Sequence, residues 1–160
     1  MKKNNNLTIG IVAAAAVILY IKRKPIMEAA QVLVWDVATA TRIATLHPQV
    51  RQKAIDFINA AEKKGIKLRV VSAFRSIAEQ NKLYAQGRTA PGNIVTKAKG
   101  GQSSHNFGTA IDVVPIVNGQ PDWDTDWHKI ATIGKSLGFS WGGDWKSFKD
   151  VAHVEAARKC

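Results

Sequence analysis

A run of fifteen uncharged residues near the N-terminus restricts the fold more than any other feature of this chain. The run, LTIGIVAAAAVILYI, spans residues 7–21 and lies between basic residues at 2–3 and 22–24. A membrane-spanning helix needs about 20 apolar residues, and flanking lysines can extend a shorter one by snorkelling. The basic residues on both sides of the run argue against a helix buried in the core. The basic cluster directly after the run is a poor context for signal-peptide cleavage. Residues 1–24 are therefore predicted to be an N-terminal anchor that contacts the membrane through residues 7–21.

The rest of the chain has the length of one small folded domain. Residues 45–160 are predicted to form it, with residues 25–44 as a linker or N-terminal helix. From Arg42 onward the chain carries 18 basic and 10 acidic residues, so the domain is basic and favours anionic partners. The cations are scattered, without zinc-finger spacing or an arginine-rich helix, so no nucleic-acid partner is expected. The protein is expected to be a monomer.

Hydrophobic periodicity predicts an α+β domain. An amphipathic helix is expected over residues 47–65, where apolar residues recur at helical spacing before a glycine stop. Its predicted buried face consists of Val50, Ala54, Phe57, Ile58 and Ala61. The other expected elements are strands over 66–73, 108–117, 139–141 and 151–155 and helices over 76–87 and 124–138. Ser76 and Glu79 predict a capping box at the start of the helix over 76–87, and NGQPD, residues 118–122, predicts a turn. With a long loop over 88–104, this order favours a small, mostly antiparallel sheet packed with helices.

One stretch, GGQSSHNFGTAIDVVP, places a histidine and an aspartate seven residues apart. His105 lies in a Gly/Ser loop, and Asp112 lies inside the strand that follows. An odd spacing would put the two side chains on opposite faces of one continuous strand. Because His105 precedes the strand, the loop can turn its imidazole back toward Asp112, and Gly108 permits that turn. We therefore expect these two side chains to lie close together.

A second candidate group lies in DVAHVE, where Asp150 precedes His153 by three residues. Zinc is bound by His, Asp, Glu and Cys, and a catalytic zinc site leaves one position open for water. His105, Asp112 and His153 could fill three positions, and Asp150 could accept a proton from the water. On spacing alone, the same residues could instead be hydrogen-bonded groups of the core or surface, so both interpretations stay open.

Longer motifs carry a resemblance to a known family. SSHNFGTAID, residues 103–112, matches the SxHxxGxAxD signature of the VanY-like M15 peptidases, zinc enzymes that include D-Ala-D-Ala carboxypeptidases and L-alanyl-D-glutamate peptidases. Residues 74–112 and GFSWGGDWKSFKDVAHVE, residues 138–155, are similar to the L-alanyl-D-glutamate endopeptidase branch, which includes phage endolysins. The resemblance covers residues 45–155 and implies the D-Ala-D-Ala peptidase or hedgehog-like fold, with the zinc site at the sheet.

The resemblance implies a role for each matching residue. One zinc ion would be held by His105, Asp112 and His153. Asp150 would be the general base, where other branches carry glutamate, and Arg75 would stabilise the oxyanion. Gln80 and Ser103 match polar positions that line the site and bind substrate. The sequence AHVE departs from the more usual Pro-His-aromatic form, which affects packing beside His153 and leaves the ligand itself in place.

The implied activity is zinc-dependent hydrolysis of the L-Ala–D-Glu bond in the peptidoglycan stem peptide. A small basic hydrolase of this kind resembles a phage endolysin that lyses the host cell wall, and residues 1–24 then resemble a signal-arrest-release segment. The alternatives are a D,D-carboxypeptidase and a bacterial wall-remodelling peptidase of the same family. The enzyme is expected to be membrane-anchored or exported to the periplasm or cell wall, after synthesis in the host cytoplasm if a phage encodes it.

Overall fold

The computed structural model describes residues 36–157 of the 160-residue chain. Residues 36–44 form a helix. The elements that follow are α2 (Pro48–Lys63), β1 (Leu68–Ser72), α3 (Ile77–Ala85), the 3₁₀ helix η1 (Ser104–Phe107), β2 (Ala110–Val117), β3 (Gln120–Pro121), α4 (Trp127–Ser136), β4 (Phe139–Trp141), the 3₁₀ helix η2 (Gly142–Asp144) and β5 (His153–Ala156). The predicted order of the main helices and strands is confirmed.

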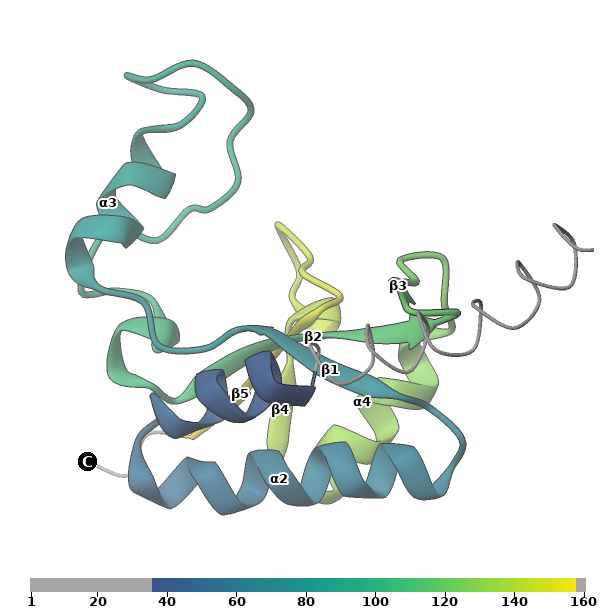
Figure 1. The fold of residues 1–160 in the computed structure, drawn as a ribbon. Helices are drawn as coiled ribbons and strands as arrows, with labels where there is room; N and C mark the ends of the chain where they lie inside the picture. The colour runs from purple at the N-terminus through teal and green to yellow at the C-terminus, as the bar shows by residue number, and fades with distance from the viewer. Residues whose placement is uncertain (1–35, 158–160) are drawn as a thin grey trace, which may run out of the picture.

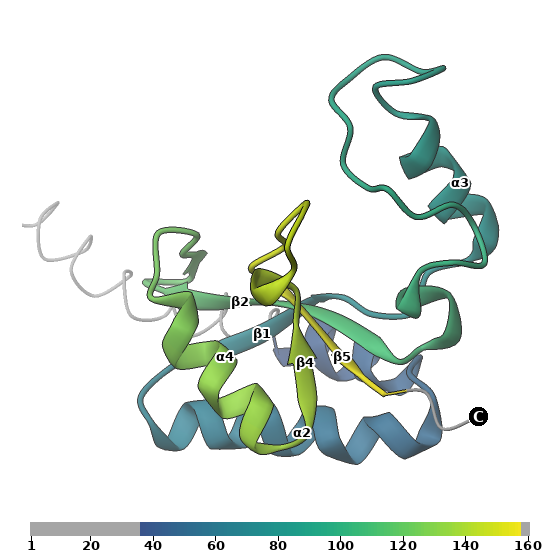
Figure 2. The ribbon, with the colours of Figure 1, turned by 180° about the vertical axis from the view of Figure 1, so that it is seen from behind.

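The five strands form one antiparallel sheet, in the order β1-β2-β5-β4, with β3 paired to the far end of β2. Helices α2 and α4 lie on one side of this sheet (Figure 1). On the other side, α3 with its following loop and the loop between β4 and β5 both rise away from the sheet (Figures 1 and 2). The fold is therefore the predicted α+β class, and the two rising segments border a site at the open side of the sheet.

The core lies between the sheet and helices α2 and α4. The buried residues of α2 are the five that its periodicity predicted. The ring of Phe57 packs at 5.7 Å, centroid to centroid, from that of Phe139 on β4. Helix α3 differs, because Gln80 is its one buried residue. The predicted capping box is present, with Ser76 and Glu79 bonded to each other's backbone N–H groups, so α3 is held by its cap and by Gln80 instead of by an apolar face.

The helix over residues 36–44 closes the free edge of the sheet at β1. The Val70 N–H donates to Thr39 Oγ1 at 3.2 Å, and Arg42 Nη1 donates to the Val70 carbonyl at 3.1 Å. Ile43 is buried in the common core. Unpaired edge groups favour unwanted strand pairing, so this helix protects the edge. The domain boundary at residue 45 stays a prediction, as does the anchor, because residues 1–35 lie outside the described part.

Two boundaries differ from the sequence prediction. The expected turn at NGQPD is a tight hairpin, because Asn118 and Gly119 both adopt positive φ (51° and 78°) and allow β3 to pair with β2. The strand predicted from residue 151 begins at His153 instead. The His153 N–H donates to the Asp150 carbonyl at 3.3 Å, so residues 150–153 form a turn that leaves Val151 exposed.

None of the helices among residues 36–157 is both long and apolar enough to cross a bilayer.

Candidate metal centre

The sheet register and one 3₁₀ helix bring two histidines and an aspartate together. Asp112 on β2 is the direct cross-strand partner of His153 on β5, so their side chains share one face of the sheet. His105 lies in η1, which ends at Gly108 in a left-handed conformation (φ 64°) just before β2 begins. This turn brings the His105 imidazole back over the start of the strand, and His105 Nε2 lies 3.2 Å from Asp112 Oδ1. The expected approach of these two side chains is present.

Three potential ligand atoms converge at this point. His105 Nε2 lies 3.2 Å from His153 Nδ1, which in turn lies 3.1 Å from Asp112 Oδ1. Both histidines are buried, at 3% and 5% exposure. Three electron-rich atoms this close in a buried site repel each other unless a positive charge lies between them. The group is therefore suited to hold a proton or a metal ion.

The outer contacts of the two imidazoles leave the converging nitrogens available as ligands. His105 Nδ1 lies 2.6 Å from the Ala73 carbonyl, which accepts only from a protonated nitrogen. His153 Nε2 lies 3.4 Å from Glu155 Oε2. With protons on these outer nitrogens, His105 Nε2 and His153 Nδ1 present lone pairs to the centre. Glu155 thus supports the ring of His153.

The geometry of the cluster fits Zn²⁺. Two ligand atoms at the usual zinc bond lengths in a tetrahedral site lie about 3.3 Å apart. The three distances here are 3.1–3.2 Å. Two imidazoles and one carboxylate are common zinc ligands, and three protein ligands leave the fourth position to water or substrate. The residues present therefore suit a catalytic type of zinc site.

The pKa values reflect the same crowding of charge. Burial acts to raise the pKa of Asp112, but its hydrogen-bond contacts with His105 and His153 outweigh burial and hold that pKa well below its usual range. Burial acts to lower the pKa of His153, but the carboxylates of Asp112 and Glu155 raise it to about 9. In the metal-free protein at neutral pH, His153 therefore carries the positive charge of the cluster.

Asp150 lies beside the cluster on the loop between β4 and β5. Its N–H donates to the Gly142 carbonyl at 3.2 Å, and its own carbonyl accepts from the His153 N–H. Burial and the negative charge of Asp112 raise the pKa of the Asp150 carboxyl. A carboxylate with a raised pKa next to a metal group is suited to accept a proton near neutral pH.

Arg75 and Gln80 form a connected pair. Arg75 Nη1 donates to Gln80 Oε1 at 2.9 Å and Nη2 donates to Ser72 Oγ at 3.0 Å. The same Nη2 lies 3.7 Å from Asp112 Oδ2, so the guanidinium is fixed next to the cluster. Gln80 is completely buried, and its Nε2 donates to the Ala98 carbonyl at 2.9 Å. Gln80 therefore positions Arg75 and ties the long loop to α3, and its expected contact with substrate stays a prediction.

The cluster opens into a cavity of about 590 Å³ between the long loop after α3 and the β4–β5 loop. Asp150, Arg75 and Ser103 line it together with the three candidate ligands. Ser103 caps η1 by accepting from the His105 N–H at 3.3 Å. Across the cavity, Lys97 Nζ lies 5.7 Å from the centroid of the Phe148 ring. The two loops thus contact each other over the site.

Two further residues shape the site, and Gly142 was not found by sequence reasoning. Gly142 packs so closely that an added Cβ would lie 2.5 Å from the Asp150 carbonyl oxygen and 3.1 Å from His153 Cβ. Trp145 lines the cavity, with its ring 5.0 Å from that of His153. The consecutive glycines in WGGDW are a signal of close packing, and the sequence allows Trp145 either a substrate contact or a packing role.

The remaining histidines and Trp141 have structural positions. His47 caps α2 by accepting from the Gln49 N–H at 3.4 Å. His128 is exposed and packs edge-on against the ring of Trp141. Trp141 is buried, and its Nε1 donates to the Val151 carbonyl at 2.8 Å. These three residues support the fold and do not line the metal-site cavity.

Comparison with known proteins identifies the family. Residues 43–143 match the family model VanY, described as D-alanyl-D-alanine carboxypeptidase. The chain belongs to the VanY family of M15 metallopeptidases. It is 48% identical to the peptidoglycan L-alanyl-D-glutamate endopeptidase CwlK of Bacillus subtilis, over 69% of this chain and 72% of that protein. It is 38% identical to the L-alanyl-D-glutamate peptidase of Listeria phage A118, over 34% of this chain and 21% of the phage protein.

Solved structures of this family share the fold. The L-Ala D-Glu endopeptidase ChiX of Serratia marcescens matches with a TM-score of 0.56 at 23% identity, over 74% of this chain and 86% of that chain. A mutant of the vancomycin-resistance D,D-pentapeptidase VanY, solved with Zn(II), matches with a TM-score of 0.56 at 15% identity, over 69% of this chain and 72% of that chain. At these identities the likeness concerns the fold.

Proposed function

We propose that this protein is a zinc-dependent peptidoglycan hydrolase that cleaves the L-Ala–D-Glu bond of the stem peptide. The observation that carries the proposal is the convergence of His105 Nε2, His153 Nδ1 and Asp112 Oδ1 at 3.1–3.2 Å, next to the carboxyl of Asp150. A zinc ion held by these three residues would supply a Lewis acid for the scissile carbonyl and the attacking water.

Asp150 is the proton acceptor in this proposal. Its raised pKa brings the carboxylate closer to the proton affinity that a general base needs near neutral pH. The carboxylate then passes the proton to the departing amine, because peptide-bond cleavage needs a protonated leaving group. The turn over residues 150–153 links Asp150 to the strand of His153, so the base and the ligand keep a fixed relative position.

Arg75 stabilises the negative charge that develops on the carbonyl oxygen. Its guanidinium is held by Gln80 and Ser72 and therefore needs little reorganisation during the reaction. Ser103 borders the cavity beside His105 and can donate its hydroxyl hydrogen to a backbone carbonyl of the substrate. Gln80 acts through Arg75 and the loop, so we assign it a positioning role.

The names of similar proteins support the choice of the L-Ala–D-Glu bond as the bond that is cleaved. CwlK, at 48% identity, is named for cleavage between L-alanine and D-glutamate. The alternative, a D,D-carboxypeptidase, is supported by the description of the family model. The A118 peptidase supports a phage endolysin, and a bacterial wall-remodelling peptidase is the other setting that we consider.

Digestion of purified peptidoglycan distinguishes these bonds. The full chain is incubated with peptidoglycan, with and without a zinc chelator, and the new termini are identified by mass spectrometry. We expect new D-Glu amino termini that disappear with chelator and return when zinc is added. Release of free D-Ala would assign the carboxypeptidase activity instead, and no product from a zinc-loaded protein would contradict the proposed substrate.

We also propose that residues 7–21 hold the enzyme at the membrane before it acts on the wall. The support is the uncharged run between two basic clusters. Fractionation of cells that express the full chain should recover the protein with membranes, and a chain without residues 1–24 should be released. Recovery of the full chain in the cytosol alone would contradict this localisation.

A further inference from the structure

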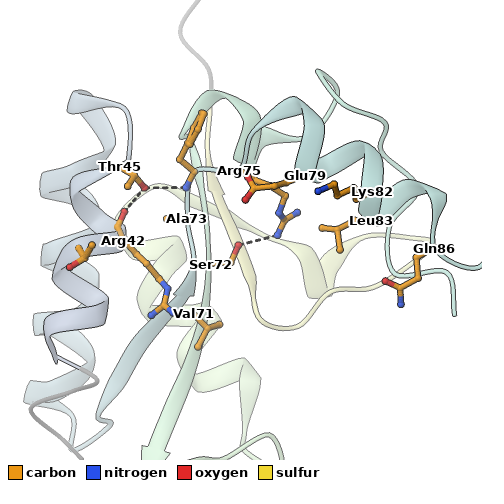
Figure 3. A pocket seen from close by; sticks show the side chains of 12 residues that line it. Arg42, Thr45, Val71, Ser72, Ala73, Arg75, Glu79, Lys82, Leu83 and Gln86 are labelled. Atoms are coloured by element: carbon orange, nitrogen blue, oxygen red, sulfur yellow. Dashed lines mark hydrogen bonds between the residues drawn. The ribbon is translucent and has the colours of Figure 1, made fainter. Parts of the chain in front are cut away.

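A second cleft adjoins the metal-site cavity. It has a volume of about 550 Å³ and lies between the helix over residues 36–44, the end of β1 and the inner side of α3 (Figure 3). Arg75 and Leu83 line both this cleft and the metal-site cavity. Helix α3 therefore forms one wall of two adjoining hollows, with the Arg75 guanidinium where they meet.

The second cleft carries more positive than negative charge, because Arg42, Arg75 and Lys82 line it together with one carboxylate, Glu79. Arg42 and Lys82 line it, and neither forms an ion pair with another residue of the described part, 36–157. Glu79 attracts Lys82 and Arg75, but it is also bonded to the N–H and hydroxyl of Ser76 at 2.8 and 2.7 Å, so it offsets only part of this positive charge. Arg42 uses one N–H for the Val70 carbonyl and keeps further donors for a ligand.

Most of the hydroxyl groups around this cleft are already used within the protein. Thr45 Oγ1 donates to the Arg42 carbonyl at 2.7 Å and accepts from the Phe74 N–H (Figure 3). Ser72 Oγ accepts from Arg75, and Thr41 Oγ1 donates to the Val37 carbonyl. A sugar would need several hydroxyl and amide partners, and the cleft keeps mainly the Ser72 hydroxyl hydrogen and the Gln86 amide for one, whereas its cations favour carboxylates. The cleft is therefore suited to an anionic peptide.

We infer that this second cleft binds the carboxylates of the stem peptide on the carboxyl-terminal side of the scissile bond, the side that begins with D-Glu. The inference rests on the proposed function. Beyond the L-Ala–D-Glu bond the peptide carries the free D-Glu carboxylate and its terminal carboxylate, whereas L-Ala and the lactyl-sugar on the other side are uncharged. A peptide that enters the second cleft past Arg75 places its negative groups near Arg42 and Lys82, with its scissile bond at the metal centre.

Two soluble peptides test this inference in the zinc-loaded full chain. One is N-acetyl-L-Ala-γ-D-Glu-L-Lys-D-Ala with free carboxylates, and the other is the same peptide with its carboxylates amidated. The variants are Lys82→Gln and Arg42→Gln, and the control is Lys63→Gln, an exposed lysine at the end of α2. Lys82→Gln is the primary variant, because Arg42 also bonds to β1 and its replacement affects folding.

Each cleft variant should raise KM for the free peptide about threefold to tenfold and leave kcat unchanged. These variants should not change KM for the amidated peptide. The control Lys63→Gln should leave KM unchanged for both peptides. Equal effects on both peptides, or no effect of either variant, would overturn the inference.

A binding measurement separates this inference from the proposed function. Titration calorimetry with the product D-Glu-γ-L-Lys-D-Ala should give a Kd that Lys82→Gln weakens by the same factor. If the wild type binds this peptide through Lys82 but cleaves neither substrate, the inference stands and the proposed activity fails. If the wild type cleaves the free peptide but Lys82→Gln leaves KM and product binding unchanged, the inference fails and the activity stands.

Discussion

The proton on His153 competes with a metal ion for the same lone pair. In the metal-free protein, Asp112 and Glu155 raise the pKa of His153 to about 9, so its ring is charged at neutral pH. A zinc ion can bind His153 Nδ1 only after that proton leaves. Zinc binding should therefore release protons and strengthen as the pH rises.

The stability of the metal-free protein should have the opposite pH dependence. Because the folded pKa of His153, about 9, lies above the ordinary histidine value of 6.5, its contribution is complete below about pH 6.5 and is lost as the pH rises toward 9. The slope from this one group reaches at most about 1.4 kcal/mol per pH unit. Urea unfolding of the metal-free wild type and His153→Gln between pH 6 and 9 measures the difference. If the free energy of unfolding changed with pH in the same way in both proteins, the positive charge assigned to His153 would be contradicted.

At the scale of elements, the loop between β4 and β5 depends on Gly142. This residue lies directly under Asp150 and His153, where a Cβ would come 2.5 Å from the Asp150 carbonyl oxygen. Real Cβ atoms do not approach backbone this closely, so the loop must move to accept any side chain. A movement of this loop shifts the proposed base and one proposed ligand together.

Gly142→Ala should therefore lower kcat/KM at least about tenfold and weaken zinc binding, since misplaced reacting groups cost about this much or more. Gly134→Ala is the matched control, because its added methyl would meet the Phe57 ring at 3.3 Å in the core, away from the cavity. The control should lose stability and keep its zinc affinity. Unchanged zinc affinity and activity in Gly142→Ala would show that the loop does not fix the site.

For the whole molecule, the sequence predicted the features that neighbouring residues create. The buried face of α2 and the capping box of α3 each depend on residues within a few turns of one helix, and both are present. The contact of His105 with Asp112 was also predictable, because only a short loop separates the two residues. Long-range features needed the family resemblance, since the pairing of Asp112 with His153 depends on the register of β2 against β5.

Some features of the fold could not be predicted from the hydrophobic periodicity of the chain. The helix over residues 36–44 binds the edge of β1 through the side chains of Thr39 and Arg42, and hydrophobic patterning does not report such contacts. The turn at residues 150–153 shortened the last strand because the backbone bonds back on itself. The burial of Gln80 also depends on a loop 16–18 residues away.

The most direct test of the metal centre compares zinc content and activity in two variants of the full chain. Asp150→Ala and His153→Ala are purified, zinc per chain is measured by atomic absorption, and peptidoglycan hydrolysis is assayed. We expect Asp150→Ala to retain one zinc ion and lose about 10²-fold or more of its activity, as for removal of a general base. We expect His153→Ala to lose both. Full zinc content in His153→Ala, or full activity in Asp150→Ala, would contradict the account.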